Sequence, residues 1–331
     1  MKQRIMVLIP GIILTALIAA VAQGLGSLGL LSLVGPSVWA LLIGICLHPV
    51  AKQFAFFQEG IGFTAKKLLR FAIIGMGFTL NLTQVLSIGS FSAIVMLFTL
   101  VTAFGGGYLL GKILGLDWRQ SALISAGTGI CGASAIAALA PVIDGDEEAI
   151  AWALSATFIF DVAMVILFPL MGRALAMSDI GYGLWAGTAV NDTSSVLAAG
   201  YAFSEEAGSF AIIVKLARTL SIVPIAILFS WINGRSSQRK QVSLQRIFPW
   251  FIILFLAAVL LNSLSLIPPA FGAQVAKSGR FIMVMALGAV GLSTDARAMA
   301  CSATKPMTHG FIISVAVVLV SYLVQALLNQ I

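Results

Sequence analysis

The sequence predicts an all-α polytopic membrane protein that forms a single integral membrane transporter domain over residues 1–331. Hydrophobic residues make up 60% of the chain and charged residues only 9%, whereas a soluble domain carries about 25% charged residues. Nearly the whole length is divided into apolar stretches close to the ~20 residues that a membrane helix requires. We therefore expect no soluble domain of appreciable size.

Eleven apolar stretches are candidate spans, which predicts about 10–11 transmembrane helices. They run approximately over Ile5–Gly24, Leu30–Leu47, Leu68–Leu86, Ile88–Leu114, Ser121–Val142, Ala149–Met171, Gly181–Phe203, Phe210–Ile232, Ile247–Leu266, Ser278–Thr294 and Met307–Leu328. The second and the tenth are short enough to be tilted or re-entrant. The first follows Lys2 and Arg4 and so imitates a signal peptide, but its length and the spans behind it predict an uncleaved helix.

Basic and acidic loops alternate along the chain, and basic loops usually face the cytoplasm. With the amino terminus inside, the cytoplasmic loops hold most basic residues: Lys52, Lys66, Lys67, Arg119, Arg173, Arg235, Arg239, Lys240, Arg246, Arg297 and Lys305. The outer loops hold the acidic residues Asp144, Asp146, Glu147, Glu148, Glu205 and Glu206. Lys277 is the one exception. This pattern predicts a cytoplasmic amino terminus and an external carboxyl terminus.

Two glycine-rich polar segments interrupt the apolar stretches. Ala126–Ala138 reads A-G-T-G-I-C-G-A-S-A-I-A-A, and Ala186–Gly200 reads A-G-T-A-V-N-D-T-S-S-V-L-A-A-G. A weak helix is tolerated at membrane depth only where protein or a water-filled cavity surrounds its backbone. Matching interruptions are the best indication in a sequence of a transporter's central site. We therefore expect two discontinuous helices that meet near the midplane; close helix packing by the small residues is the alternative reading, and it is stronger for the first segment.

The same segments suggest an internal repeat. Aligning them pairs identical residues: Gly127 with Gly187, Thr128 with Thr188, and Ser134 with Ser194. A second pattern, K-x-x-R-F, begins at Lys67 and again at Lys277, in spans that are predicted to run oppositely, as an inverted repeat requires. The fifth and seventh spans, however, run in parallel in this topology. Either one short segment is not a true span, or the glycine-rich segments meet without being symmetry mates.

Four ionisable residues lie well inside predicted spans: Asp161, Asp192, Lys215 and Arg218. Each costs about 2.5 kcal/mol or more at the bilayer centre, so each should face a cavity or a partner. An ion pair of Asp161 with Arg218 would leave Asp192 to neutralise Lys215. Protonating either acid would then leave excess positive charge, which would couple the binding of an anion to protons. The same acids could instead bind a cation in exchange for protons.

The sequence argues against several other classes. Cys46, Cys131 and Cys301 form no CxxC pattern, and His48 and His309 are isolated, so we expect no metal and no cofactor. We find no nucleophile with a matching base and no GxxxxGK[ST] motif, which disfavours an enzyme and an ATP-driven pump. The net charge of +7 fits basic cytoplasmic loops, so we do not expect nucleic acid as a partner.

Three features together resemble the YeiH-like family of bacterial inner-membrane proteins, which is labelled as sulfate exporters. They are the run G-T-G-I-C-G-A-S-A at 127–135, the run N-D-T-S-S-V-L-A-A-G at 191–200, and Lys215-x-x-Arg218. The resemblance covers most of the chain and implies the inner membrane of a bacterium. At the level of the fold it also implies similarity to sodium–proton antiporters and bile-acid transporters, with an inverted repeat and crossed, broken helices. Relatives commonly have histidine at the position of Asn191 and glutamine at that of Ser195, so this site is less basic and its polar side chains are shorter.

We therefore expect a secondary transporter of a small solute, with a sulfate-like inorganic or organic anion as the favoured substrate, coupled to protons or to the membrane potential. A cation–proton antiporter that uses Asp192 and Asp161 is the main alternative, and a channel is a further one. The residues expected at the substrate come from both segments and from the eighth span: Gly127, Thr128, Gly129, Cys131, Gly132, Ser134, Gly187, Thr188, Asn191, Asp192, Thr193, Ser194, Ser195, Lys215 and Arg218. The expected partners are this solute and the lipid bilayer, and the sequence is compatible with a homodimer.

Overall fold

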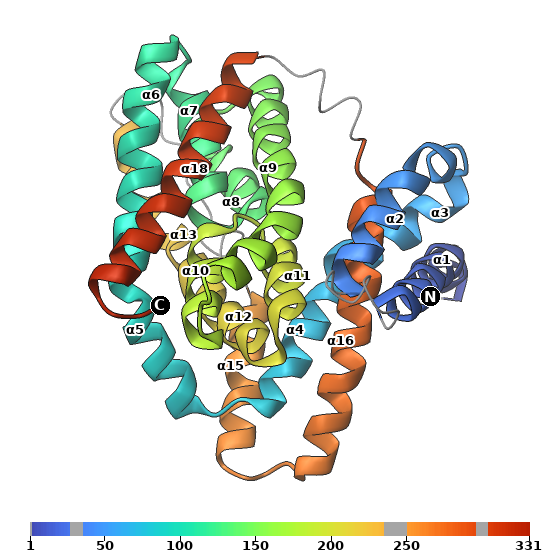
Figure 1. Ribbon diagram of the computed structural model, residues 1–331. Helices are drawn as coiled ribbons and strands as arrows, with labels where there is room; N and C mark the ends of the chain where they lie inside the picture. Colours follow the sequence, from blue (N-terminus) through green and yellow to red (C-terminus); the bar gives the residue numbers. More distant parts are fainter. Residues whose placement is uncertain (1, 27–35, 235–249, 296–303) are drawn as a thin grey trace. The chain divides into compact units, whose positions relative to one another are not determined.

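The computed structural model describes residues 2–26, 36–234, 250–295 and 304–331, and within these ranges the chain is almost entirely helical and has no strand (Figure 1). The predicted all-α polytopic membrane protein is confirmed. Among the described residues, six helices are long and apolar enough to cross a membrane: Met6–Gly26, Leu82–Leu114, Glu147–Ala174, Glu205–Asn233, Ala270–Leu292 and Thr304–Leu327. Two shorter apolar helices are Pro36–Ala51 and Trp250–Ser263.

The chain divides into two compact units, and the first comprises Met1–Ser87 and Trp250–Ala296. Its helices are α1 (Lys2–Gly26), α2 (Pro36–Ala51), α3 (Ala55–Phe63), α4 (Leu69–Met76), α15 (Trp250–Ser263) and α16 (Pro269–Leu292). A π-helical turn, η2 (Thr64–Leu68), joins α3 to α4, and a 3-10 turn, η3 (Gly77–Thr79), follows α4. Gly44 of α2 packs against Gly291 of α16 so closely that a side chain on either would collide with the opposing backbone.

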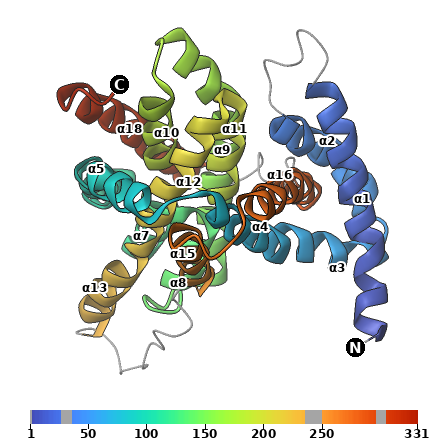
Figure 2. The ribbon, with the colours of Figure 1, turned by 90° about the horizontal axis from the view of Figure 1, so that it is seen from below.

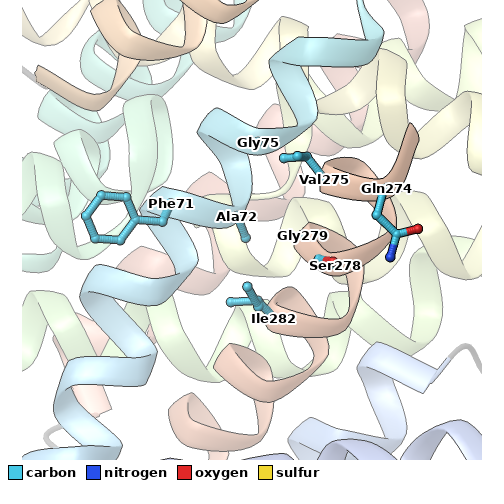
Figure 3. A pocket seen from close by; sticks show the side chains of 8 residues that line it. All are labelled: Phe71, Ala72, Gly75, Gln274, Val275, Ser278, Gly279 and Ile282. Atoms are coloured by element: carbon cyan, nitrogen blue, oxygen red, sulfur yellow. The ribbon is translucent and has the colours of Figure 1, made fainter. Parts of the chain in front are cut away.

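Helices α4 and α16 run antiparallel, because Gly75 lies against Val275 while Gly279 lies against Ala72. The first copy of the K-x-x-R-F pattern begins in η2, directly before α4, and the second lies in α16, so the predicted opposite directions of these two spans are confirmed. A small open groove of about 200 Å³ lies between the two helices (Figure 3). Its lining is mostly apolar and consists of Phe71, Ala72, Gly75, Gln274, Val275, Ser278, Gly279 and Ile282. None of the four intramembrane ionisable residues lines it.

The second unit comprises Ile88–Pro249 and Arg297–Ile331. Its long helices are α5 (Leu82–Val101), which continues through η4 (Thr102–Gly106) into α6 (Gly107–Leu114), then α9 (Glu147–Ala174), α12 (Glu205–Leu220), α13 (Ile222–Gly234) and α18 (Thr304–Leu327). Between them lie shorter pieces: α7 (Trp118–Ala126), which continues into η5 (Gly127–Cys131), α8 (Ala133–Leu139), α10 (Asp179–Ala189) and α11 (Thr193–Phe203). Figure 2 shows α10 and α11 beside α12, on which both pack.

The fifth predicted span is a re-entrant hairpin and does not cross. The chain runs along α7 and η5 to Gly132, whose φ of 64° and ψ of −135° turn it back into α8. A Cβ atom on Gly127 would lie 2.9 Å from Cδ1 of Ile136, although nine residues of straight helix span about 13 Å. Gly145 lies in the same way against Leu123. The first hairpin, residues 118–139, therefore returns to the end of the unit where it began.

The seventh predicted span is a second re-entrant hairpin, residues 179–203. The ring of Tyr182 in α10 stacks on Phe203 of α11 with 4.0 Å between centroids, and its hydroxyl donates to the carbonyl oxygen of Ala199 at 3.1 Å. The hydroxyl of Ser204 donates to the Asp179 carboxylate. These contacts join the first turn of α10 to the last turn of α11, so the chain reverses between them, at residues 190–192.

Two of the eleven predicted spans, the fifth and the seventh, therefore do not cross the membrane. This changes the side on which the loops next to them lie. Because α9 connects the two hairpins, they enter the second unit from opposite ends. The acidic segment 144–148 lies at the end where Arg119 lies, because Gly145 contacts the first turns of α7. Arg173 lies at the opposite end, where it donates to the carbonyl oxygen of Ala202. The sequence predicted Arg119 and Arg173 on one side and the acidic segment 144–148 on the other. This prediction is corrected: the acidic segment shares the side of Arg119, and Arg173 lies on the opposite side.

Some predicted boundaries also shift. The third span, predicted as Leu68–Leu86, belongs to a helix that begins at Ala55 and ends at Thr79, and the fourth begins at Leu82. The tenth is longer than predicted, since α16 extends from Pro269 to Leu292 and so reaches the length of a membrane span. Parts of the predictions lie outside the described residues: positions 30–35 of the second span, 247–249 of the ninth, Cys301, and the basic residues Arg235, Arg239, Lys240, Arg246 and Arg297.

Candidate functional site

The two hairpins meet at their tips. A Cβ atom on Gly132 would lie 2.9 Å from the Cβ of Asp192, so the contact admits only glycine. The predicted approach of the two glycine-rich segments is confirmed. Residues 118–131 of the first hairpin extend about 21 Å and the 11 residues of α10 about 16 Å. Each is roughly half of a ~30 Å hydrocarbon core or somewhat more, so hairpins from opposite surfaces would meet near its centre.

Two carboxylates bind the N–H groups that the break in the second hairpin leaves free. Asp161 of α9 accepts from the backbone N–H of Asn191 at 2.9 Å through Oδ1 and from that of Asp192 at 3.0 Å through Oδ2. Asp192 is the N-cap of α11 and accepts from the backbone N–H of Ser194 at 2.9 Å. A helix start carries partial positive charge and unpaired donors, so both acids are stabilised there.

Two cations bind carbonyl oxygens of the hairpins in the same way. The Lys215 ammonium donates to the carbonyl oxygen of Val190, directly after α10, at 2.9 Å. Arg218 donates from Nη2 to the carbonyl oxygen of Thr128, in η5, at 2.9 Å. Lys215 is 0% exposed and Arg218 is 1% exposed. Because the carboxyl end of a helix carries partial negative charge, the ends of the broken helices stabilise both cations.

The direct ion pair of Asp161 with Arg218 that the sequence suggested is not formed: Arg218 donates to Thr128, and its other guanidinium nitrogens have no hydrogen-bond partner among the described residues. The physical reason is that the broken helices supply backbone N–H groups and carbonyl oxygens as partners for the charges. The four charged groups still lie close enough to interact electrostatically. We call Asp161, Asp192, Lys215 and Arg218, together with the hairpin tips at Gly132 and residues 190–192, the tip cluster. Its formal charges sum to zero.

Helix α18 supplies two partners that the sequence analysis missed. Thr128 and Thr188, which the repeat alignment pairs, each contact one of its serines. The hydroxyl of Thr128 lies 3.4 Å from that of Ser314, and the hydroxyl of Thr188 lies 2.6 Å from that of Ser321. Both serines are 0% exposed. Their spacing of seven residues puts them on one face of an otherwise apolar helix, and this spacing is the signal that could have found them.

Three buried polar atoms of the tip cluster lack a hydrogen-bond partner: Nε and Nη1 of Arg218 and Oδ1 of Asn191. The Asn191 amide nitrogen has only a long contact, 3.4 Å, to the Ser314 hydroxyl. A buried polar group without a partner costs about 1–3 kcal/mol. Such groups are rare and call for an explanation, of which a bound ion or water is one.

The other predicted site residues fall into two groups. The glycines serve packing, since a Cβ atom would lie 2.8 Å from Thr157 at Gly127, 2.8 Å from Ala103 at Gly129 and 2.7 Å from Val214 at Gly187. Cys131, Ser194 and Ser195 are buried, and the Cys131 thiol lies within electrostatic reach of Lys215. Asp192 and Thr193 are half-buried, and Ser134 is exposed.

Comparison with known proteins finds matches over almost the whole chain. The family model described as conserved hypothetical protein 698 matches residues 10–310. A UPF0324 membrane protein of Clostridium tetani is 53% identical over 97% of each chain. UPF0324 membrane proteins of Streptococcus pneumoniae and Fusobacterium nucleatum are 39% and 38% identical, each over 96% of this chain and 97% or 98% of their own. These names state a membrane protein and specify no substrate.

Proposed function

This chain belongs to the family described as conserved hypothetical protein 698, and we propose that it is a secondary transporter of a small anion, coupled to protons or to the membrane potential. The observation that carries the proposal is the pair of hairpins from opposite ends of one unit, whose tips meet at a buried charge cluster. Secondary transporters build their substrate and ion sites from such discontinuous helices. A channel is less compatible with the closely packed contact of Gly132 with Asp192.

The unpartnered groups of the tip cluster favour an anion. Arg218 retains Nε and Nη1 as free donors, whereas both oxygens of Asp161 are already engaged by N–H groups. A carboxylate, a sulfonate or a sulfate-like oxoanion would supply the acceptors that the guanidinium lacks. The start of α11 does not offer an anion site, because Asp161 and Asp192 already accept from its N–H groups. The case for an anion therefore rests on Arg218.

A cation–proton antiporter remains the second candidate because Asp192 is half-buried and Asn191 has a free acceptor oxygen. A cation at these groups would compete with the Lys215 ammonium for the carbonyl oxygen of Val190. That competition makes the antiporter the weaker proposal.

We further propose the inner membrane of a bacterium as the location, with the amino terminus in the cytoplasm and the carboxyl terminus outside. Because both hairpins fail to cross, the number of crossings falls by two and the predicted sides of the termini are unchanged. The acidic segment 144–148 then faces the cytoplasm, which is compatible with the positive-inside rule because acidic residues contribute little to it. The whole chain would act as one transporter in the bilayer, and a homodimer is compatible with this function.

Thermal unfolding of the purified protein with added ions tests the proposal. The probes are sulfate, acetate and methanesulfonate as anions, and sodium and lithium as cations, each at several pH values. An anion present at 100 times its Kd would add ~2.7 kcal/mol to the stability of the folded state. We expect stabilisation by an anion, stronger at low pH and lost in Arg218→Gln, while Arg173→Gln removes a basic residue far from the tip cluster and serves as the control. Stabilisation by sodium or lithium alone, growing with pH, would favour the antiporter.

A further inference from the structure

We propose that the Lys215 ammonium occupies the position that a coupling sodium ion would take at the tip cluster, so that the coupling ion of this transporter is the proton. The inference rests on the proposed function and deepens it by naming the coupling ion. It makes Lys215 the residue that determines the ion specificity of the site.

The break in the second hairpin leaves the carbonyl oxygen of Val190 outside helix α10. Helix α10 ends at Ala189, and Val190 is extended, with φ −75° and ψ 136°. Because the helix has ended, no backbone N–H group of α10 binds this carbonyl oxygen. It accepts instead from the Lys215 ammonium at 2.9 Å. In transporters built from broken helices, unwound backbone carbonyls and the carboxyl ends of half-helices coordinate the coupling ion, sodium or a proton. Here a side-chain cation already holds that carbonyl.

Four charged or titratable groups lie within electrostatic range of the Lys215 ammonium: Asp161 of α9, Asp192 at the start of α11, Cys131 of η5, and Arg218 of its own helix. The direct partner of the ammonium is the carbonyl oxygen of Val190, a ligand of the kind that hard cations prefer, while the two carboxylates act on it over a longer distance. A sodium ion and the ammonium carry the same charge, so they compete for this place, and the ammonium is tethered there at high effective concentration.

In the first hairpin, too, a side-chain cation binds a backbone carbonyl oxygen near the tip. Its carbonyl at Thr128 is held by Arg218 at 2.9 Å. Each hairpin thus has a tethered cation on a carbonyl near its tip, and both cations are buried. Neither of these two carbonyl oxygens remains free for an ion from solution.

The net charge of the tip cluster depends on the protonation of Lys215. Its two acids and two bases balance when Lys215 is protonated. If Lys215 lost its proton, the cluster would carry one net negative charge, and the carbonyl oxygen of Val190 would lose its donor. An anion would then be repelled from Arg218. Anion and proton therefore favour each other's binding, which is the thermodynamic basis for moving them together.

The test measures thermal unfolding of the purified full chain in sodium, lithium or potassium chloride against choline chloride at equal ionic strength. The variants are Lys215→Ser, which vacates the position and leaves a hydroxyl oxygen, and Lys215→Arg, which keeps a cation there. Lys112→Ser removes an exposed lysine of α6 and controls for the loss of one positive charge. We expect a saturable, sodium- or lithium-dependent rise in melting temperature, on the order of 5 °C at 100 times the Kd, in Lys215→Ser alone.

Two results would overturn the inference: a saturable response of the wild-type protein to sodium, or no response in folded Lys215→Ser. If Lys215→Ser does not fold, the wild-type protein and Lys215→Arg decide, because both must be insensitive to sodium. Sulfate, acetate and methanesulfonate are tested on the same samples. A wild-type protein stabilised by an anion and by sodium would refute only the choice of coupling ion, whereas stabilisation by sodium alone would also refute the proposed anion transport.

Discussion

Arg218 donates to the carbonyl oxygen of Thr128 at 2.9 Å, so a buried guanidinium is held by the backbone of a broken helix. The same principle places Asp161 on the N–H groups of Asn191 and Asp192. Charges that are costly in a membrane protein are thereby used to satisfy backbone groups that would be equally costly. The tip cluster is consequently both a structural element and the candidate site, and its variants should separate these roles.

Asp161→Asn should destabilise the folded protein by about 1.5–3 kcal/mol. The amide keeps one oxygen, so it can accept from only one of the two N–H groups and presents its own N–H₂ group to the other. Thermal or denaturant unfolding in detergent measures the effect. Asp117→Asn is the matched control, because Asp117 caps α7 and asparagine caps a helix start about as well as aspartate. Equal stability of the two variants would refute the role assigned to Asp161.

Gly132→Ala should destabilise the protein by about 1–3 kcal/mol, since a φ of 64° with a ψ of −135° is accessible essentially to glycine alone. Its new Cβ would also displace Asp192 and so weaken the binding of an anion. Gly105→Ala is the control, because that helical glycine has open space around it and alanine should stabilise the helix by about 0.5–1 kcal/mol. Unfolding curves of both variants measure the two changes in stability. A Gly132→Ala protein as stable as Gly105→Ala would contradict the hairpin turn.

The re-entrant topology predicts which loops share a membrane side. Single cysteines at positions 119 and 147 should react with an impermeant thiol reagent from one side, and those at 173 and 205 from the other. The background is the chain without Cys46, Cys131 and Cys301. If positions 119 and 147 were labelled from opposite sides, the first hairpin would have to be a crossing helix.

The location of the candidate site could be predicted from the sequence, but the path of the chain through it could not. Glycine-rich polar runs at membrane depth identify discontinuous helices, and Gly132 does meet Asp192. A hairpin and a crossing helix need a similar number of apolar residues, however, so length does not distinguish them. The reversal depends on the left-handed φ of Gly132 and on packing such as that of Gly127 against Ile136, which no hydropathy pattern reveals.

The partners of the charges were equally hidden from the sequence. Counting acids and bases suggested the ion pair of Asp161 with Arg218, because opposite charges are the obvious partners. Which backbone groups a break leaves free is known only once its position is known. Helix α18 was missed for a related reason: Ser314 and Ser321 look like ordinary small residues until the threonines of both hairpins lie against them.

The most direct test of the central claim is transport by the purified protein in proteoliposomes that contain a pH-sensitive dye. Sulfate, acetate, methanesulfonate, sodium and lithium are added outside in turn, with acetate corrected for its passive entry as acetic acid in protein-free vesicles. We expect at least one anion to carry protons into the lumen and acidify it with the wild-type protein and with Arg173→Gln, and this movement to be absent with Arg218→Gln. Proton movement driven only by sodium or lithium, and unaffected by Arg218→Gln, would contradict the account.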